Sequence, residues 1–210
     1  MFSQIINLLK LRIGVVMMLT ALVAMAVTPG QPASALDMTV LAFAILAAAG
    51  SAGAFNQYFE VELDRRVPRT STRPFVTGYF KKGPMWLAII LLLLVVGVGS
   101  AALVLNLSAA FYIFLGAFFY AVVYTVWLKR RSWTNIVIGG ASGSFAVLAG
   151  AAAVDPAIGP IAIMLALVLF LWTPSHFWSL AIAKSKDYER TGIPMLPVVI
   201  GNRRCAQVVL

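Results

Sequence analysis

The chain has 210 residues, of which 61% are hydrophobic and 11% charged, whereas soluble domains carry about 45–50% apolar and about 25% charged residues. A soluble domain of this size could not bury so many apolar side chains, and the mean hydropathy of +0.94 indicates a membrane protein. The formal net charge is +9, but the basic residues occupy short gaps between apolar runs. We therefore predict a lipid bilayer as a partner and no nucleic acid.

Six apolar runs are long enough to cross a membrane, for which a helix needs about 20 mostly apolar residues. In chain order they are Leu11–Val27, Met38–Phe59, Met85–Leu105, Leu107–Leu128, Asn135–Val154 and Ile158–Ala183. A seventh run is expected to begin near Ala206 and to be cut off at Leu210. We predict an all-α, polytopic membrane helix bundle with six complete transmembrane helices and the start of a seventh. It forms one domain over residues 1–210 that is incomplete at its C-terminal end.

The Lys and Arg residues are confined to every second gap between these runs. The basic gaps hold Lys10 and Arg12; Arg65, Arg66, Arg69, Arg73, Lys81 and Lys82; Lys129, Arg130 and Arg131; and Lys184, Lys186, Arg190, Arg203 and Arg204. Because basic loops stay in the cytoplasm, we predict a multi-pass protein of the cell inner membrane. Its N-terminus and its charged, active face are expected on the cytoplasmic side.

Three polar side chains end the second run at helical spacing. Asn56, Glu60 and Asp64 are each four residues apart, which places them on one face of an α-helix. Carboxylates in a membrane helix are costly, so they usually face a cavity and carry function. Two carboxylates and an amide are oxygen ligands of the kind that Mg²⁺ uses together with the phosphate oxygens of a substrate.

Basic residues follow this array directly. They are Arg65, Arg66, Arg69 and Arg73. Arg side chains match phosphate oxygens geometrically, so the helix end and the loop together favour a metal-bridged diphosphate site. In the alternative interpretation, Glu60, Glu62 and Asp64 only pair with these arginines at a solvated helix end. The array taken alone does not decide between the two.

A second polar cluster ends the sixth run. Pro174 is expected to kink the helix there, and His176 is the single histidine of the chain. A lone histidine is more often a packing residue, but an ionisable group inside a membrane helix is a functional candidate. Lys184, Lys186 and Asp187 follow on the same cytoplasmic side as the first array. Two polar helix ends beside an apolar interior predict a pocket for an amphiphile with a charged head.

These residues resemble a known family. The first aspartate-rich motif of UbiA-type intramembrane prenyltransferases is similar to the run N-Q-Y-F-E-V-E-L-D-R-R-V-P-R-T-S-T-R-P, from Asn56 to Pro74. Within that family, two further runs resemble the protohaem IX farnesyltransferase branch, whose members are also called haem O synthases. They are W-T-P-S-H-F-W-S-L-A-I (Trp172 to Ile182) and K-D-Y-E-R-T-G-I-P-M-L-P-V-V (Lys186 to Val199), and Y-T-V-W-L-K-R (Tyr124 to Arg130) fits the same branch.

The resemblance implies a helix bundle around a central cavity, with Mg²⁺ as cofactor and farnesyl diphosphate bound at the cytoplasmic mouth. It implies transfer of the farnesyl group to a vinyl carbon of haem B, giving haem O and diphosphate. The implied protein partners are haem A synthase or assembly proteins of terminal oxidases. Two alternatives stay open, a UbiA-type enzyme that prenylates an aromatic or quinone precursor and a membrane transporter. The run around His176 argues against the first, and the gathering of charge at one face argues against the second.

By residue matching, Asn56, Glu60 and Asp64 take the family's metal-diphosphate role, Arg69 and Arg73 match the basic tail of its motif, and Lys10 and Arg12 match the basic start of its first helix. We predict as catalytic residues Asn56, Glu60, Asp64, His176 and Asp187, of which the first three are the implied metal ligands. The predicted diphosphate contacts are Lys10, Arg12, Arg65, Arg69, Arg73, Lys129, Lys184 and Lys186. The predicted prenyl or haem pocket includes Tyr120, Tyr124, Trp172, Phe177 and Tyr188.

Two positions depart from the family's pattern. Glu60 stands where many relatives carry Asp, which moves the carboxylate oxygens by one methylene. The second aspartate-rich motif keeps only Asp187, which leaves the number of metal ions open. Tyr120 and Tyr124, one helical turn apart, could stabilise a carbocation with their π faces, and packing explains them equally well.

Overall fold

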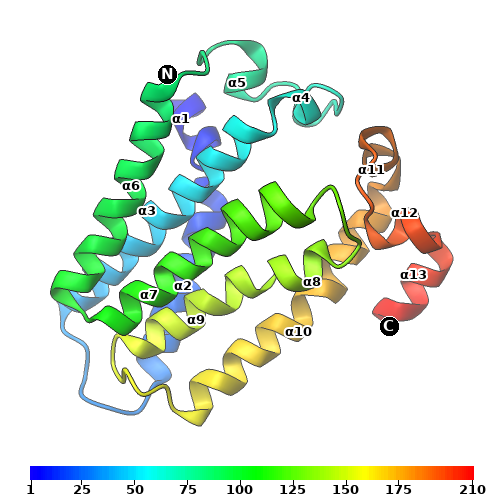
Figure 1. Cartoon of the computed structure of the whole chain (residues 1–210). Coiled ribbons are helices and arrows are strands. Elements are labelled where there is room, and N and C mark those ends of the chain that lie inside the picture. The colour runs from blue at the N-terminus through cyan, green and yellow to red at the C-terminus, as the bar shows by residue number, and fades with distance from the viewer.

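The computed structural model describes the backbone of all 210 residues and every side chain except that of Phe2. Every regular element of the described backbone is a helix (Figure 1), which confirms the predicted all-α class. The elements are α1 (Phe2–Leu8), α2 (Leu11–Val27), α3 (Ala35–Phe59), α4 (Val61–Asp64), α5 (Pro74–Thr77), α6 (Pro84–Val104), α7 (Leu107–Phe118), η1 (Phe119–Leu128), α8 (Asn135–Gly139), α9 (Ala141–Ala152), α10 (Pro160–Ala183), α11 (Ser185–Thr191), α12 (Leu196–Ile200) and α13 (Asn202–Val209).

Five helical stretches are long and apolar enough to cross a membrane. They are α3, α6, α7 continued by η1, α8 continued by α9, and α10. The first predicted span, α2, is apolar but has 17 residues, at the short end of the range for a transmembrane helix. Five of the six predicted spans are therefore supported by length and composition, and α2 stays a prediction as the sixth.

The C-terminal segment folds back onto the bundle. The helix predicted to begin near Ala206 begins earlier, because α13 starts at Asn202. Its Cys205 is fully buried in a cluster with Trp178 and Ala181 of α10. The prediction that this helix continues as a seventh span remains a prediction.

Local sequence signals explain where the long helices begin. Ser34 caps α3, because its hydroxyl accepts from the backbone N–H of Asp37 while the Asp37 carboxylate accepts from the Ser34 N–H at 2.9 Å. Asn106 caps α7 by accepting from a backbone N–H three residues later at 2.9 Å. Pro84 and Pro160 are the first residues of α6 and α10, where a missing N–H leaves no hydrogen bond unmade.

The helix α10 continues through Pro174 without interruption, from Pro160 to Ala183. Two hydroxyls bond to the backbone on either side of the proline: that of Thr173 donates to the carbonyl of Leu169 at 2.7 Å, and that of Ser179 donates to the carbonyl of Ser175 at 2.8 Å. The proline does not divide α10 into two helices, and the kink expected at it stays a prediction.

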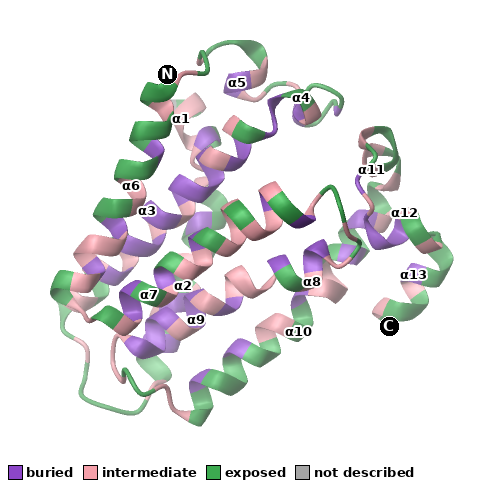
Figure 2. Cartoon of the chain, in the orientation of Figure 1, coloured by how far each residue is buried: buried purple, intermediate pink, exposed green. Residues whose placement is uncertain are grey.

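The helix α3 is packed through small residues, whereas α6 and α10 present large apolar ones. Buried side chains of α3 include Ala44, Ala48 and Ala52, and small residues let membrane helices approach closely. In Figure 2 many residues of α3 are buried, while α6 and α10 are exposed along much of their length. The exposed side chains there include Leu92 at 62% and Val168 at 64%. Such a surface suits lipid.

Glycines allow close contacts between helices. A Cβ on Gly150 of α9 would lie 1.9 Å from the carbonyl oxygen of Ala21 in α2, and one on Gly97 of α6 would lie 2.9 Å from the Cβ of Ala47. Glycine is needed for close packing at these positions. Gly99 differs, because an added Cβ there would meet nothing within 4 Å.

Substituting Gly150 with alanine is expected to destabilise the bundle. In the variant Gly150→Ala, α2 and α9 must move apart, which we expect to lower the free energy of unfolding by roughly 1–3 kcal/mol. Thermal unfolding of the detergent-solubilised protein measures the change. Gly99→Ala is the matched control, since alanine favours a helix by about 1 kcal/mol over glycine and meets no neighbour there. Equal unfolding temperatures of the two variants would contradict this packing.

The two kinds of gap lie at opposite ends of the bundle. In Figure 1 the connections between α2 and α3, α6 and α7, and α9 and α10 lie toward the lower left, whereas α1, α5 and α4 lie along the top and α11 lies at the upper right. The second group belongs to the basic gaps. The alternation of charge along the sequence therefore corresponds to two ends of the folded chain, of which one is basic.

Candidate active site

A polar cavity of about 150 Å³ lies at the basic end of the bundle. It forms where the end of α3, the chain from α4 to α5, η1 and α11 meet, together with the turn before α2. The residues that line it are Lys10, Asn56, Leu63, Asp64, Val67, Arg69, Thr70, Arg73, Tyr120, Tyr124, Lys129, Asp187, Tyr188, Thr191 and Ile193. The first motif and the run Lys186–Val199, which are far apart in the sequence, therefore share one cavity.

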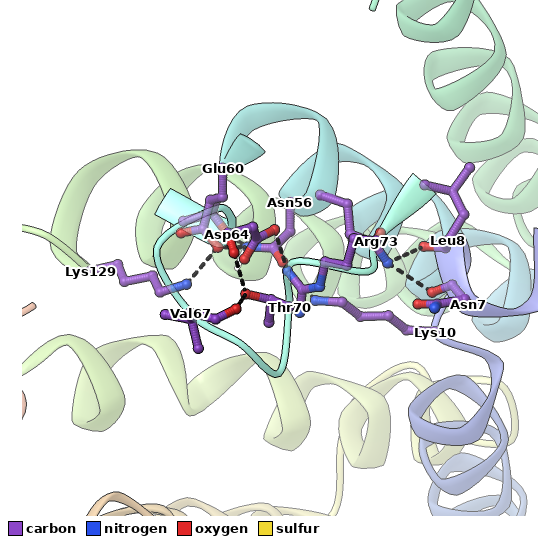
Figure 3. A network of polar contacts seen from close by, with 12 residues as sticks. Asn7, Leu8, Lys10, Asn56, Glu60, Asp64, Val67, Thr70, Arg73 and Lys129 are labelled. Atoms are coloured by element: carbon purple, nitrogen blue, oxygen red, sulfur yellow. Dashed lines mark hydrogen bonds and ion pairs between the residues drawn. The ribbon is translucent and has the colours of Figure 1, made fainter. Parts of the chain in front are cut away.

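The array of Asn56, Glu60 and Asp64 keeps helical register across a break in the helix. α3 ends at Phe59, and Glu60 has φ −97° and ψ 17° before α4 begins. The backbone N–H of Glu60 still donates to the carbonyl of Asn56 at 3.0 Å, and that of Asp64 donates to the carbonyl of Glu60 at 2.9 Å. The three side chains lie together (Figure 3), with exposed fractions of 2%, 0% and 5% in chain order.

Both carboxylates of the array pair with a basic side chain (Figure 3). The Lys129 ammonium donates to Glu60 Oε2 at 2.5 Å. The Arg73 guanidinium donates to Asp64 Oδ2 at 2.6 Å, and the Thr70 hydroxyl donates to the backbone carbonyl of Asp64 at 2.9 Å. A buried carboxylate is costly unless it is paired, so these cations stabilise the array. The two carboxylates are buried and do not form a solvated helix end.

Lys10 reaches the array from the turn before α2. Its ammonium donates to Asn56 Oδ1 at 2.6 Å, and its backbone is left-handed with φ 50°, which costs a non-glycine residue about 1–2 kcal/mol. The Gln57 side-chain amide donates to the carbonyls of Asn7 at 2.8 Å and Leu8 at 3.3 Å, which holds this turn against α3. Burial, followed by the charge of a nearby guanidinium, lowers the pKa of Lys10 to about 7. A bound anion would raise it again.

The fourth predicted span changes from an α-helix to a π-helix as it reaches the cavity. The π-helix Phe119–Leu128 has 10 residues, and this rare form often occurs at functional sites. It carries Tyr120, Tyr124 and Thr125, and the Thr125 hydroxyl accepts from the side-chain amide of Asn56 at 3.2 Å. The two tyrosine rings are stacked, with centroids 5.7 Å apart. The hydrophobic pattern gave no sign of this change.

An apolar cavity of about 300 Å³ adjoins the polar one. Lys10, Tyr120 and Tyr124 line both, and the Lys10 ammonium donates to the Tyr120 hydroxyl at 2.8 Å. The other residues that line it are Ile13, Gly14, Met17, Ile45, Ala48, Ala49, Ala52, Gly53, Tyr112, Ile113, Gly116, Ala117, Ile136, Gly139, Gly140, Ser142, Gly143, Ala146, Leu169, Trp172, Thr173 and Phe177. A polar cavity and an apolar cavity therefore lie side by side and share three lining residues, as expected for a pocket that holds an amphiphile.

Most of the predicted site residues lie at one of the two cavities. Those that line the polar cavity are Lys10, Asn56, Asp64, Arg69, Arg73, Tyr120, Tyr124, Lys129, Asp187 and Tyr188. Trp172 and Phe177 line the apolar cavity. Glu60 lies directly behind the polar cavity, where its contacts with Lys129 and Asn56 cover it. Burial raises the pKa of Tyr188, so its hydroxyl stays protonated and can donate a hydrogen bond.

Four predicted diphosphate contacts lie at neither cavity. They are Arg12, Arg65, Lys184 and Lys186, all exposed. Arg12 lies in the first turn of α2, whereas Lys10 stands outside that helix on a left-handed backbone. Arg65 pairs instead with the exposed Glu62 at 3.2 Å. The two lysines flank the start of α11, whose cavity-lining residues come later in the helix. The folded chain does not bring these four cations to the array.

His176 lies half-buried on α10, outside both cavities. Its ring stacks on that of Trp172, with centroids 4.3 Å apart and an interplanar angle of 14°. It also meets Phe177 edge to face at 5.3 Å. Because these two neighbours line the apolar cavity, His176 is one side chain away from it. A direct contact between His176 and a substrate stays a prediction.

Three threonines at the site were not among the predicted residues. Thr70 and Thr191 line the polar cavity, and Thr125 lies behind Asn56. All three lie in runs that resemble the family, Thr70 in Asn56–Pro74, Thr125 in Tyr124–Arg130 and Thr191 in Lys186–Val199, and these runs are the only sequence signal for them. The hydrogen bond between Thr125 and Asn56 joins α3 to η1, and no spacing in the sequence indicates it.

The array fits a hard divalent cation such as Mg²⁺. Asn56 and Asp64 line the cavity, and Glu60 Oε1 is buried with no hydrogen-bond partner among the described residues. A buried acceptor without a partner is costly, and a cation would satisfy it. The described side chains contain no group of three or more His, Cys, Asp or Glu that could hold a metal ion. Mg²⁺ does not need one, because it binds through one or two carboxylates plus substrate phosphates.

Known proteins share both the sequence and the fold. The family model described as UbiA prenyltransferase family matches residues 17–210. The chain belongs to the UbiA prenyltransferase family. Within this family, the relative named "Protoheme IX farnesyltransferase 2" from Paramagnetospirillum magneticum is 52% identical over 97% of this chain and 71% of its own length. "Protoheme IX farnesyltransferase 1" from the same organism is 47% identical over 100% of this chain and 73% of its own length. The resemblance seen in the motifs is confirmed.

Solved structures of UbiA homologues have the same architecture. The homologue from Archaeoglobus fulgidus bound to DMAPP and Mg²⁺ matches with a TM-score of 0.84 at 18% identity, over 98% of this chain and 72% of that one. The apo homologue from Aeropyrum pernix K1 matches with a TM-score of 0.77 at 21% identity, over 95% of this chain and 74% of that one. The UbiA-type fold is confirmed. Family membership and the apolar helices together make this chain an integral membrane protein.

Proposed function

We propose that this UbiA family member is a haem O synthase, which transfers the farnesyl group of farnesyl diphosphate to a vinyl group of haem B. The observation that carries the proposal is the 52% identity with a relative named protoheme IX farnesyltransferase, over 97% of this chain. The two adjoining cavities support it, because farnesyl diphosphate has a charged head and a long apolar tail. The head suits the polar cavity and the tail suits the apolar one.

Asn56, Glu60 and Asp64 are proposed to hold Mg²⁺, which when bound stabilises the charge that develops on the leaving diphosphate. The UbiA homologue from Archaeoglobus fulgidus has been solved with DMAPP and Mg²⁺ and with GPP and Mg²⁺. The oxygens of the array and the orphaned carboxylate oxygen of Glu60 support the same ion here. Glu60 becomes available to a metal when Lys129 leaves it.

The diphosphate is proposed to bind the cations that line the polar cavity. These are Lys10, Arg69, Arg73 and Lys129. Lys129 and Arg73 already lie at the array, where they pair with its carboxylates. Charge-assisted hydrogen bonds from such groups to phosphate oxygens are about twice as strong as neutral ones. Asp187 and Tyr188, which also line the cavity, are proposed to complete the site from α11.

The proposed reaction breaks the allylic C–O bond of farnesyl diphosphate and forms a C–C bond to haem B. The π electrons of the vinyl group attack the allylic carbon, and the electron pair of the broken bond leaves with diphosphate. Water then adds to the electron-poor carbon of the former vinyl group and loses a proton, which gives the hydroxyl of haem O. Tyr120 and Tyr124 are proposed to stabilise the allylic cation with their ring faces. The apolar walls exclude the bulk water that would quench that cation.

The haem is proposed to approach along α10. Trp172 and Phe177 line the apolar cavity, and His176 stacks on the first of them. His176 is proposed to orient the haem iron or the water that adds to the vinyl carbon. The confinement of basic residues to one end of the bundle supports an inner-membrane protein whose N-terminus and polar cavity face the cytoplasm.

Haem analysis tests the proposed function. The full-length protein, purified and supplied with haem B, farnesyl diphosphate and Mg²⁺, is expected to form haem O, detected by chromatography and mass. No product without Mg²⁺ is the expected control. A prenylated aromatic or quinone precursor in place of haem O would favour the other UbiA-type activity. Solute flux through liposomes without haem O formation would favour a transporter.

A further inference from the structure

The hydroxyl of Thr125 touches the array although it cannot touch a substrate. Thr125 has no exposed surface and lines neither cavity. Its oxygen accepts from the side-chain amide of Asn56 at 3.2 Å. Its proton already forms a hydrogen bond, because the hydroxyl donates to the backbone carbonyl of Tyr120 at 2.8 Å. The oxygen therefore presents only lone pairs to Asn56.

The partners of Asn56 determine which way its amide faces. The side-chain nitrogen of Lys10 donates to Oδ1 at 2.6 Å. Glu60 and Thr125 both accept from Nδ2, at 2.8 Å and 3.2 Å. The amide oxygen is thereby directed to the polar cavity and the amide nitrogen away from it. In the reverse orientation Nδ2 would face an ammonium, and the oxygen would face a carboxylate.

The π-helix supplies the position of this hydroxyl. Thr125 bonds to the carbonyl five residues before it, which is the register of a π-helix, whereas an α-helix would offer the carbonyl four residues before. In the widened turn the Thr125 hydroxyl makes two hydrogen bonds. It donates to a carbonyl within η1 and accepts from Asn56 of α3.

We propose that Thr125 is a positioning residue that keeps the amide oxygen of Asn56 aimed at the metal. This inference rests on the proposed function of the array. Lys10 and Glu60 carry charge, so ligand binding draws them to the phosphate oxygens and to the metal. Thr125 is neutral and outside the cavities, so its contact with Asn56 persists when the ligand is bound.

Binding of Mn²⁺, a spectroscopic substitute for Mg²⁺, tests the inference. The full-length protein is titrated with Mn²⁺ by electron paramagnetic resonance, in the presence of a non-cleavable thio analogue of farnesyl diphosphate. Thr125→Val keeps the shape and removes the hydroxyl, and it is expected to weaken Mn²⁺ binding about tenfold, which is about 1.4 kcal/mol. Thr125→Ser restores the hydroxyl and is expected to bind within about twofold of the unsubstituted protein.

A double-mutant cycle separates positioning from general stability. If Thr125 acts through Asn56, Thr125→Val is expected to add no further loss of Mn²⁺ affinity in the background Asn56→Ala. Additive losses, or a failure of Thr125→Ser to recover affinity, would overturn the inference and leave a structural role. Unchanged Mn²⁺ affinity in Thr125→Val would overturn it while the proposed function stands. No binding of Mn²⁺ by the unsubstituted protein would overturn both.

Discussion

Haem O formation is expected to fall at least about a hundredfold when Asp64 is replaced by asparagine. The change keeps the shape of the side chain and removes the charge that is proposed to bind Mg²⁺. Metal stabilisation of a transition state contributes several kcal/mol, and each 1.36 kcal/mol is tenfold in rate. Initial rates with the purified full-length protein, measured from extracted haem, test this expectation. The Mn²⁺ affinity of the variant is expected to fall with its rate.

Glu62 provides a matched control for this variant. It stands two residues earlier, is exposed, and pairs only with Arg65 at the surface. Glu62→Gln is therefore expected to keep the rate within about twofold, since exposed ion pairs contribute about 0–1 kcal/mol. An unchanged rate in Asp64→Asn, or an equal loss in both variants, would remove Asp64 from the proposed site. Thermal unfolding shows that a slow variant is still folded.

The fold could be predicted from the sequence where a pattern extends over many residues. Long apolar runs and the confinement of basic residues to alternate gaps need no tertiary knowledge, and they predicted the helix bundle and its two ends. A single residue carries less information. The kink expected at Pro174 stays a prediction, since α10 is continuous across it. Gly99 faces open space, because a glycine in a membrane helix makes a close contact only where another helix passes.

The array was predictable because it is local. Four-residue spacing places Asn56, Glu60 and Asp64 together even though α3 ends at Phe59, since the backbone hydrogen bonds continue across the break. The cations around it were less predictable. Arg12 and Lys10 are equally basic and two residues apart, but the left-handed turn at Lys10 directs only one of them to the cavity. That turn depends on contacts with α3.

Contacts between distant segments could not be predicted from this sequence. The π-helix carries no compositional mark, since Phe119–Leu128 is as apolar as an ordinary membrane helix. The hydrogen bond between Asn56 and Thr125 exists only once α3 and η1 have packed. The pairing of Glu60 with Lys129 likewise joins residues 69 positions apart. These interactions, which hold the array without a ligand, arise from packing.

The ion pair between Glu60 and Lys129 is expected to contribute most to the stability of the site. Glu60 is fully buried and the side chain of Lys129 is 13% exposed. Lys129→Met keeps much of the side-chain volume but leaves a buried charge without its cation. We expect it to lower the free energy of unfolding by about 3 kcal/mol and haem O formation by at least about a hundredfold. Thermal unfolding and initial rates measure the two effects separately.

A double variant separates these effects. Replacing a buried ion pair by neutral side chains of similar size is often close to neutral for stability, so Glu60→Gln combined with Lys129→Met is expected to unfold near the temperature of the unsubstituted protein. Its rate is expected to stay low, because a proposed metal ligand and a proposed phosphate contact are both absent. Arg131→Met, an exposed position in the same loop, is expected to change neither property. Recovery of haem O formation in the double variant would show that this pair serves stability alone.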